Sequence, residues 1–186
     1  MMGKARAVVE SGRRCDVSRE RRHSLREGGL FGQQLRDARD DRVGDRPDQP
    51  HRAGVDALGP EQVAVVGRWG TAIRFDGASV LTWPAQTGET LRGVAWTSPR
   101  EAIAVGDRGT VRVLRLDSAP LVVDADTSSD LFDVVPQGTG EAVIVGAEGR
   151  WIRLRGYLAE AMDLSTEADL LSVAQIGDLT VAVGEN

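Results

Sequence analysis

The residues that could carry out catalysis are few. The chain has two histidines, His23 and His51, and both lie within its first 51 residues. A Ser-His-Asp or Cys-His arrangement needs a histidine beside its nucleophile, and no histidine follows residue 51. The single cysteine, Cys15, cannot form an internal disulfide and cannot hold a metal alone. The sequence therefore predicts no catalytic residues, no metal site and no cofactor.

The densest acidic group is formed by Asp124, Asp126 and Asp130. Carboxylate oxygens are the ligands that Ca²⁺ prefers, so a calcium loop is one interpretation of this group. The spacing matches no calcium-binding loop, and acidic side chains at turns are usually solvated. A solvated loop is therefore the favoured interpretation.

Tryptophan and arginine side chains provide the best candidates for binding, because both residue types concentrate at interaction hot spots. The sequence places Trp69 at a hairpin tip, and Trp96 at the end of a strand. Packing inside the protein is the favoured alternative for Trp96 and for Trp151, whereas the two interpretations are balanced for Trp69. The candidate binding residues are Arg68, Trp69, Trp96, Asp107 and Arg108.

An internal repeat organises the chain from residue 52 onward. Four apolar runs each end in a glycine, with spacings of 39, 40 and 38 residues: Gly67, Gly106, Gly146 and Gly184. A valine precedes each of these glycines, and a second glycine follows three residues later at Gly70, Gly109 and Gly149. A second valine column upstream is formed by Val55, Val94, Val134 and Val173. So many coincident columns indicate one repeated structural unit.

Each unit is predicted to contain four short strands, which in the second copy are residues 91–96, 101–106, 110–116 and 120–126. Runs rich in Val, Ile and Leu bounded by Gly, Pro, Ser and Asp are typical of strands and turns. A period near 40 with four strands is typical of a propeller blade. We therefore expect an all-β fold, a partial β-propeller of three blades with four antiparallel strands each, plus an incomplete fourth. The expected blades are residues 52–90, 91–130, 131–169 and 170–186.

The G-x-x-G segments are interpreted as hairpin turns joining the second and third strands. Glycine adopts the positive φ values that tight turns require. A phosphate-binding or RNA-clamping loop would need a helix after it, and a strand is predicted there instead.

The segment LRGVAWTSPREAIAVGDRGTVRVLR, residues 91–115, resembles bacterial propeller repeats of the AVG-x-x-G type. Such repeats occur in photosystem II assembly-factor-like proteins and in the wider WD-repeat-like superfamily, and the resemblance covers residues 52–186. It implies a binding or assembly protein without enzymatic activity, in the cytoplasm, the envelope or the secreted fraction. The Asp box of sialidase-type propellers is absent from every copy.

Residues 1–51 differ from the rest, with a net charge of +3 against −8 for the remainder. Mixed charge without apolar periodicity predicts an arginine-rich, disordered tail. Nucleic-acid binding through this tail is a weaker alternative, because acidic residues interrupt the arginines and no aromatic platform accompanies them. No apolar run approaches the roughly 18 residues of a membrane span, and the start shows no signal peptide. The compartment is left open.

The sequence thus predicts a scaffold for protein interaction. The alternative is part of a propeller-type glycosidase or lyase completed by other sequence, in which Tyr157 and the arginines before it would act. We expect the TVAVG strand to leave an open edge and the outer faces of the first and last blades to be apolar. A homo-oligomer or further blades of a longer parent protein would cover them, and the longer parent is favoured.

Overall fold

The computed structural model describes residues 5–7 and 53–185. All of the described residues belong to one compact unit. No helix among the described residues has the length and apolar character needed to cross a membrane.

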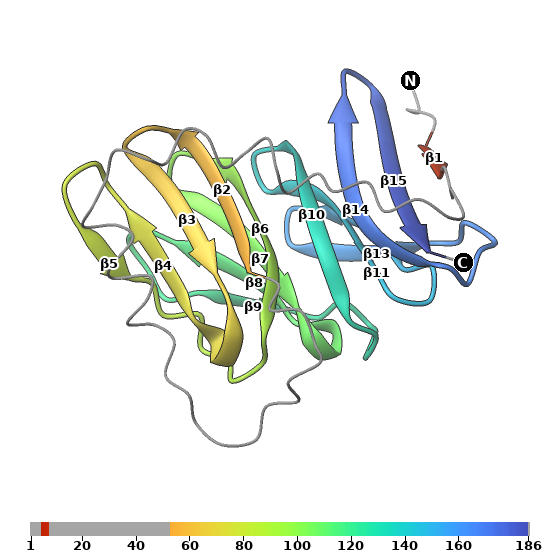
Figure 1. Ribbon diagram of the computed structural model, residues 1–186, viewed down its shortest axis with the longest axis horizontal. Coiled ribbons are helices and arrows are strands. Elements are labelled where there is room, and N and C mark those ends of the chain that lie inside the picture. The colour runs from red at the N-terminus through yellow and green to blue at the C-terminus, as the bar shows by residue number, and fades with distance from the viewer. Residues whose placement is uncertain (1–4, 8–52, 186) are drawn as a thin grey trace. The chain divides into compact units, whose positions relative to one another are not determined.

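The described chain is all-β, as the repeat predicts (Figure 1). Blade 1 consists of β2 (Gly54–Gly59), β3 (Gln62–Val66), β4 (Ala72–Phe75) and β5 (Val80–Thr82). Blade 2 consists of β6 (Leu91–Ser98), β7 (Glu101–Gly106), β8 (Val111–Arg115) and β9 (Leu121–Val123). Blade 3 consists of β10 (Leu131–Gly138), β11 (Glu141–Gly146), β12 (Trp151–Arg155) and β13 (Leu158–Met162). In each blade the strands pair antiparallel in chain order.

Blade 4 is incomplete, as expected from the sequence. It contains the antiparallel pair β14 (Asp169–Ile176) and β15 (Leu179–Glu185). Its third strand is β1 (Ala5–Ala7), which pairs parallel with β15 so that Ala5 lies opposite Thr180 and Ala7 opposite Ala182. The expected open edge on β15 is therefore partly occupied, and Ala5–Ala7 departs from the prediction of a structureless tail. The physical reason is that the unpaired N–H and C=O groups of an edge strand can form backbone hydrogen bonds with an extended segment.

The disorder predicted for the remainder of the tail, residues 1–4 and 8–51, lies outside the described residues.

Successive blades pack through one apolar layer at each interface. The layer between blades 1 and 2 includes Ala64, Val66, Val94 and Ala104, and that between blades 2 and 3 includes Ile103, Val105, Val134 and Ile144. The layer between blades 3 and 4 includes Val143, Val145, Val173 and Ala182. Every residue of β7 is buried, because a middle strand is covered on both faces when its blade lies between two others.

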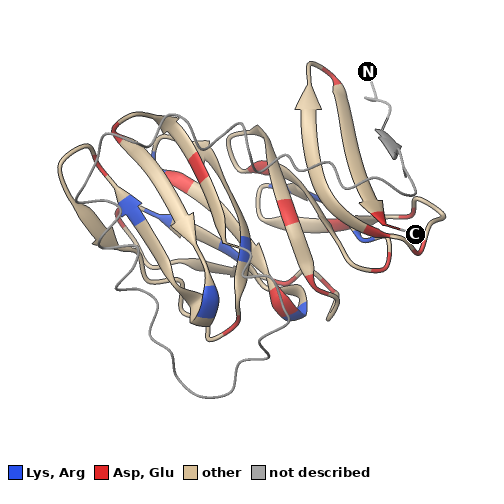
Figure 2. Cartoon of the chain, viewed as in Figure 1, with Lys and Arg blue, Asp and Glu red and all other residues tan. Residues whose placement is uncertain are grey.

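Polar contacts align the first strands of neighbouring blades. These strands touch in succession: β2 contacts β6, β6 contacts β10 and β10 contacts β14. Figure 2 marks an acidic band on β2 and another on β10, where Asp56 and Asp133 lie. The Asp56 carboxylate accepts a hydrogen bond from the backbone N–H of Trp96 at 2.9 Å, and the Asp133 carboxylate accepts one from the backbone N–H of Val173 at 2.9 Å. The propeller-like arrangement expected from the repeat is therefore present in the described residues.

Candidate functional site

The turns between the second and third strands of blades 1 to 3 repeat one backbone geometry. The residue before the second glycine has a positive φ in each: 56° at Trp69, 53° at Arg108 and 55° at Glu148. The glycine N–H then donates to a carbonyl of the loop that leaves the blade, from Gly70 to Glu89 at 2.8 Å and from Gly109 to Ser129 at 2.9 Å. The third copy repeats this bond from Gly149 to Ala168 at 2.9 Å. We call these three turns, residues 68–70, 107–109 and 147–149, the turn rim.

The loops beneath the turn rim are also held in a repeated way. A threonine hydroxyl in each loop accepts the N–H two residues later, at 3.1 Å for Thr87, 3.1 Å for Thr127 and 3.2 Å for Thr166. Asp130 accepts the Arg108 N–H at 3.0 Å, and Asp169 accepts the Glu148 N–H at 3.0 Å. Sequence reasoning missed the three threonines and Asp169 and placed Asp130 only in an acidic loop, although the spacing of all these residues follows the repeat.

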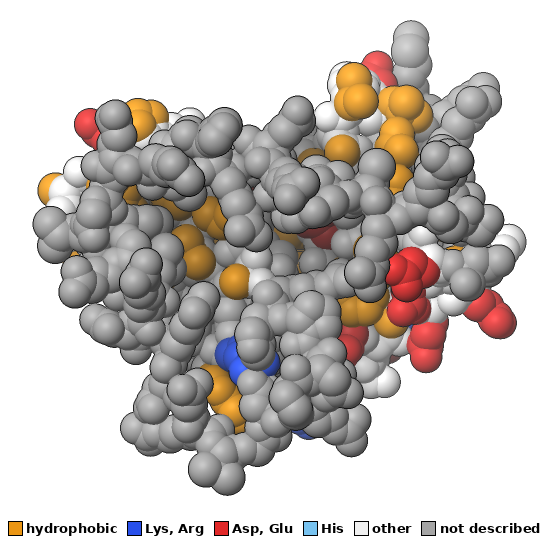
Figure 3. All heavy atoms as spheres, viewed as in Figure 1, with side chains coloured by type: hydrophobic (Ala, Val, Ile, Leu, Met, Phe, Trp, Pro, Cys, Tyr) orange, Lys and Arg blue, Asp and Glu red, His pale blue; other side chains and the backbone are white. Residues whose placement is uncertain are grey.

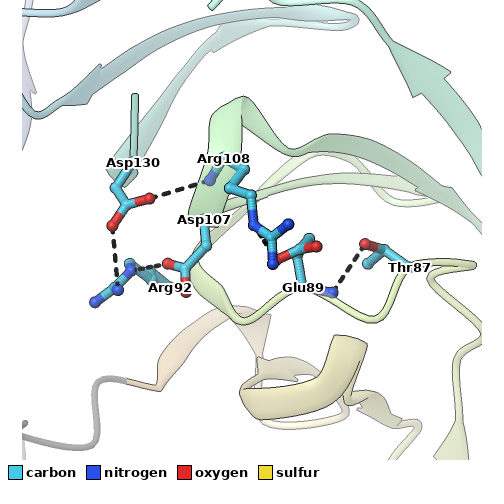
Figure 4. Close-up of polar contacts among 6 residues, drawn as sticks. All are labelled: Thr87, Glu89, Arg92, Asp107, Arg108 and Asp130. Carbon is cyan, nitrogen blue, oxygen red and sulfur yellow. Dashed lines mark hydrogen bonds and ion pairs between the residues drawn. The ribbon is translucent and has the colours of Figure 1, made fainter. Parts of the chain in front are cut away.

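Ion pairs surround the turn of blade 2 (Figure 4). Arg92 pairs with Asp107 and lies 3.5 Å from Asp130, the residue that leads into blade 3. Arg108 pairs with Glu89 at 3.2 Å. The Arg92 guanidinium also lies 5.6 Å from the centroid of the Phe132 ring. Arg92 and Asp107 are mostly covered. Their ion pair holds the turn of blade 2 against β6, and Arg92 links it to the start of blade 3 through Asp130 and Phe132.

The tips of the turn rim project into solvent. Trp69 is 69% exposed, and the side chains of Arg108 and Glu148 are 75% and 70% exposed. Arg68 lies next to Trp69 and is half-buried. Of the residues predicted to bind, Arg68, Trp69, Asp107 and Arg108 therefore lie on the turn rim.

Trp96 does not lie with them. It is 2% exposed and packs against Trp83, with ring centroids 5.2 Å apart. Trp151 is 1% exposed in the layer between blades 3 and 4. For both residues the structure supports the packing alternative, because almost none of either ring is accessible to a partner.

A second polar cluster joins blades 2 and 3. Tyr157 donates its hydroxyl to Glu101 at 2.8 Å, and Arg115 donates to the same carboxylate oxygen at 3.3 Å. The Arg115 guanidinium lies 5.0 Å from the centre of the Tyr157 ring. The neighbouring Tyr157 hydroxyl, followed by the Glu101 carboxylate, raises the pKa of Arg115, so this side chain stays charged. Glu101 itself is buried, and its acceptor oxygens are engaged within the protein.

Replacing Tyr157 with phenylalanine is expected to lower the free energy of unfolding by about 1–3 kcal/mol. The change removes one hydrogen bond to a charged, buried acceptor and keeps the ring that Arg115 covers. Urea unfolding of the two proteins measures the difference. An unchanged midpoint would show that the hydroxyl does not stabilise this contact.

The acidic turns have a structural explanation. Asp124 accepts the N–H of Asp126 at 3.0 Å, and Asp163 accepts the N–H of Ser165 at 2.7 Å. At Asp76, the donated N–H groups of Ser79 and then Ala78 hold the pKa of the carboxyl below its usual value. Across residues 5–7 and 53–185, no group of three or more His, Cys, Asp and Glu is placed to hold a metal.

Comparison with known protein families finds no family model that matches the chain, and comparison with curated proteins finds no match either. The resemblance to AVG-x-x-G propeller repeats rests on the repeat columns of the sequence and stays a prediction.

Proposed function

We propose that the chain is a non-enzymatic propeller scaffold that binds a protein partner through its turn rim. The observation that carries this proposal is that the three turns share one backbone conformation but expose a different side chain at the same position. The same turn, held by the same loop contacts, presents Trp69 on blade 1, Arg108 on blade 2 and Glu148 on blade 3. A rigid frame that presents different side chains at equivalent positions is how repeat scaffolds obtain specificity.

The chemistry of the tips favours a protein surface as the partner. An indole with 69% exposure offers an apolar anchor, and the neighbouring arginine and glutamate offer charges of both signs. Interfaces between proteins combine aromatic anchors with arginine in this way. A nucleic-acid partner would instead favour a rim with only positive charges, because its phosphates are negative.

Binding is expected to depend on the two tips of blades 1 and 2. Tagged wild-type chain and the variants Trp69→Ala and Arg108→Ala are used to capture proteins from an extract of the source cells. A partner that binds the rim is retained by the wild type and reduced about tenfold or more by each variant, as hot-spot residues contribute about 2 kcal/mol or more.

Leu158→Ala is the matched control for this experiment. Leu158 is 72% exposed on β13, away from the turn rim, so its variant should capture the same partner as the wild type. A partner that binds all four proteins equally, or no specific partner at all, would contradict the proposal.

The cluster of Glu101, Arg115 and Tyr157 is the one observation that favours the alternative of a glycosidase or lyase. A carboxylate, a phenol and an arginine are groups that such enzymes use. In this chain, however, Glu101 is held by both neighbours and is 9% exposed. We therefore propose a structural role for this cluster.

A further inference from the structure

Two valine columns meet at every interface between blades. Val66 of blade 1 and Val94 of blade 2 share one apolar layer, Val105 and Val134 share the next, and Val145 and Val173 share the third. In each case the first valine lies at the end of the second strand of a blade, directly before the repeat glycine, and the other lies on the first strand of the blade that follows. The interface therefore has two distinct halves, which we call the forward face and the rear face of a blade.

The exposure of these valines changes only at the two ends of the array. On the rear faces, Val94, Val134 and Val173 are 6%, 5% and 8% exposed, whereas Val55 of blade 1 is 51% exposed. On the forward faces, Val66, Val105 and Val145 are 1%, 0% and 0% exposed, whereas Val183 of blade 4 is 48% exposed. Blade 1 thus presents an uncovered rear face, and blade 4 presents an uncovered forward face.

Neighbouring positions follow the same pattern. On the rear side, Val65 of blade 1 is half-buried, whereas its equivalents Ala104 and Ile144 are fully buried. On the forward side, Val181 of blade 4 is half-buried, whereas its equivalents Ile103 and Val143 are buried. Figure 3 shows hydrophobic side chains over the β14–β15 hairpin and, between grey atoms, over the first sheet. Contiguous exposed apolar surface on a sheet face marks an interaction site.

We propose that a second copy of this chain covers both faces. The forward face of blade 4 in one copy packs on the rear face of blade 1 in the other, so that Val183 meets Val55 as Val66 meets Val94. The chain already forms three internal interfaces between a forward face and a rear face. Its two uncovered end faces are one of each kind, so a second copy of the chain can cover both. Contact between two rear faces would place Val55 against Val55, a pairing found in none of the three internal interfaces.

Two copies joined in this way close on themselves. The described residues of each chain form three four-stranded sheets and one three-stranded sheet. A pair therefore brings together about eight blades, within the range of about four to eight blades in propellers. The pair then contains two identical head-to-tail interfaces. This assembly does not depend on the turn rim, which lies on the turns and not on the blade faces.

The test measures the mass of the full-length chain in solution for the wild type, Val55→Asp and Val183→Asp. The wild type is expected to be a dimer. Each variant alone is expected to dissociate, with self-association weakened about 100-fold or more, because every interface then contains an unpaired carboxylate in an apolar layer. Mixing the two variants is expected to give a dimer held by one interface, since the intact forward face of Val55→Asp meets the intact rear face of Val183→Asp. The other interface of that pair carries both aspartates and stays open, so the mixture should associate more tightly than either variant alone and less tightly than the wild type.

Val122→Asp is the matched control, because Val122 is 59% exposed on β9 and belongs to neither end face. It should dimerise like the wild type, and so should Trp69→Ala, which separates this inference from the proposed binding function. Three outcomes would overturn the inference: a monomeric wild type, dissociation by Val55→Asp but not by Val183→Asp, and a mixture that associates no more tightly than each variant alone.

A second measurement keeps the inference testable if an aspartate variant does not fold. In a Cys15→Ser background, the double variant Val55→Cys, Val183→Cys should be linked into dimers by a short bis-maleimide. Each single-cysteine variant should remain unlinked, because Val55 faces Val183 of the other copy and not its own equivalent. Equal linking of the single variants would show a symmetric interface and contradict the head-to-tail pairing.

Discussion

Replacing Trp151 with alanine is expected to lower the free energy of unfolding by about 3–5 kcal/mol. Trp151 is 1% exposed and packs with Val145, Leu170 and Val173 in the layer between blades 3 and 4. Truncation removes a large apolar surface and leaves a cavity that two flat sheets can fill only in part. Its indole Nε1 makes no hydrogen bond within the described residues, so the whole effect comes from packing. Urea unfolding monitored by circular dichroism measures it.

Trp69→Ala provides the control for this prediction. Trp69 is 69% exposed, so losing its ring should change the free energy of unfolding by about 0.5 kcal/mol or less. Similar losses for the two variants would mean that the difference in burial between these tryptophans does not determine their contribution to stability.

The repeat columns explain why the fold could be predicted from the sequence. A glycine closes the apolar run of each second strand, and in blades 1 to 3 the valine before it faces the next blade. The four aligned copies therefore define both the strand order and the face that each strand buries. Period-2 alternation fixes the faces within a strand, and continuous apolar runs such as Ala102–Val105 require cover on both sides. The strands, the hairpin turns and the incomplete fourth blade follow from these local rules.

The partner strand of blade 4 could not be predicted in the same way. Ala5–Ala7 pairs with β15 through backbone groups, and a three-residue segment carries no periodic signal of its own. Its place depends on an edge more than 170 residues away in the sequence, which no local pattern encodes.

The positions of some candidate site residues could be predicted, whereas their role in binding stays a prediction. Turn composition placed Trp69 and Arg108 at hairpin tips, where they are exposed. Trp96 looks similar in sequence, but it lies two residues after Val94 on the same face of β6, so its ring enters the layer between blades 1 and 2 and packs on Trp83. The positive φ of Trp69, Arg108 and Glu148 was also missed, because non-glycine residues adopt this conformation only where surrounding contacts enforce it.

The glycine that follows each tip is constrained in two ways: its φ is positive, and an added Cβ would clash with the neighbouring loop. Gly109 has a φ of +67°, and a Cβ built on it would lie within 3.0 Å of the Thr127 carbonyl oxygen. Gly140 has a φ of +69°, but a Cβ there would meet nothing within 4 Å. Gly88 has neither a positive φ nor a close neighbour. These three glycines therefore separate the two effects.

Gly109→Ala is expected to lower the free energy of unfolding by about 2–5 kcal/mol, because about 1–2 kcal/mol of left-handed strain adds to about 1–3 kcal/mol of overpacking. Gly140→Ala should cost only the strain, and Gly88→Ala should stay within about 0.5 kcal/mol of the wild type. Urea unfolding of the three variants gives the order directly. Equal losses for Gly109→Ala and Gly140→Ala would show that the loop moves away from an added methyl group, so that close contact with Thr127 is not what holds the turn against the blade.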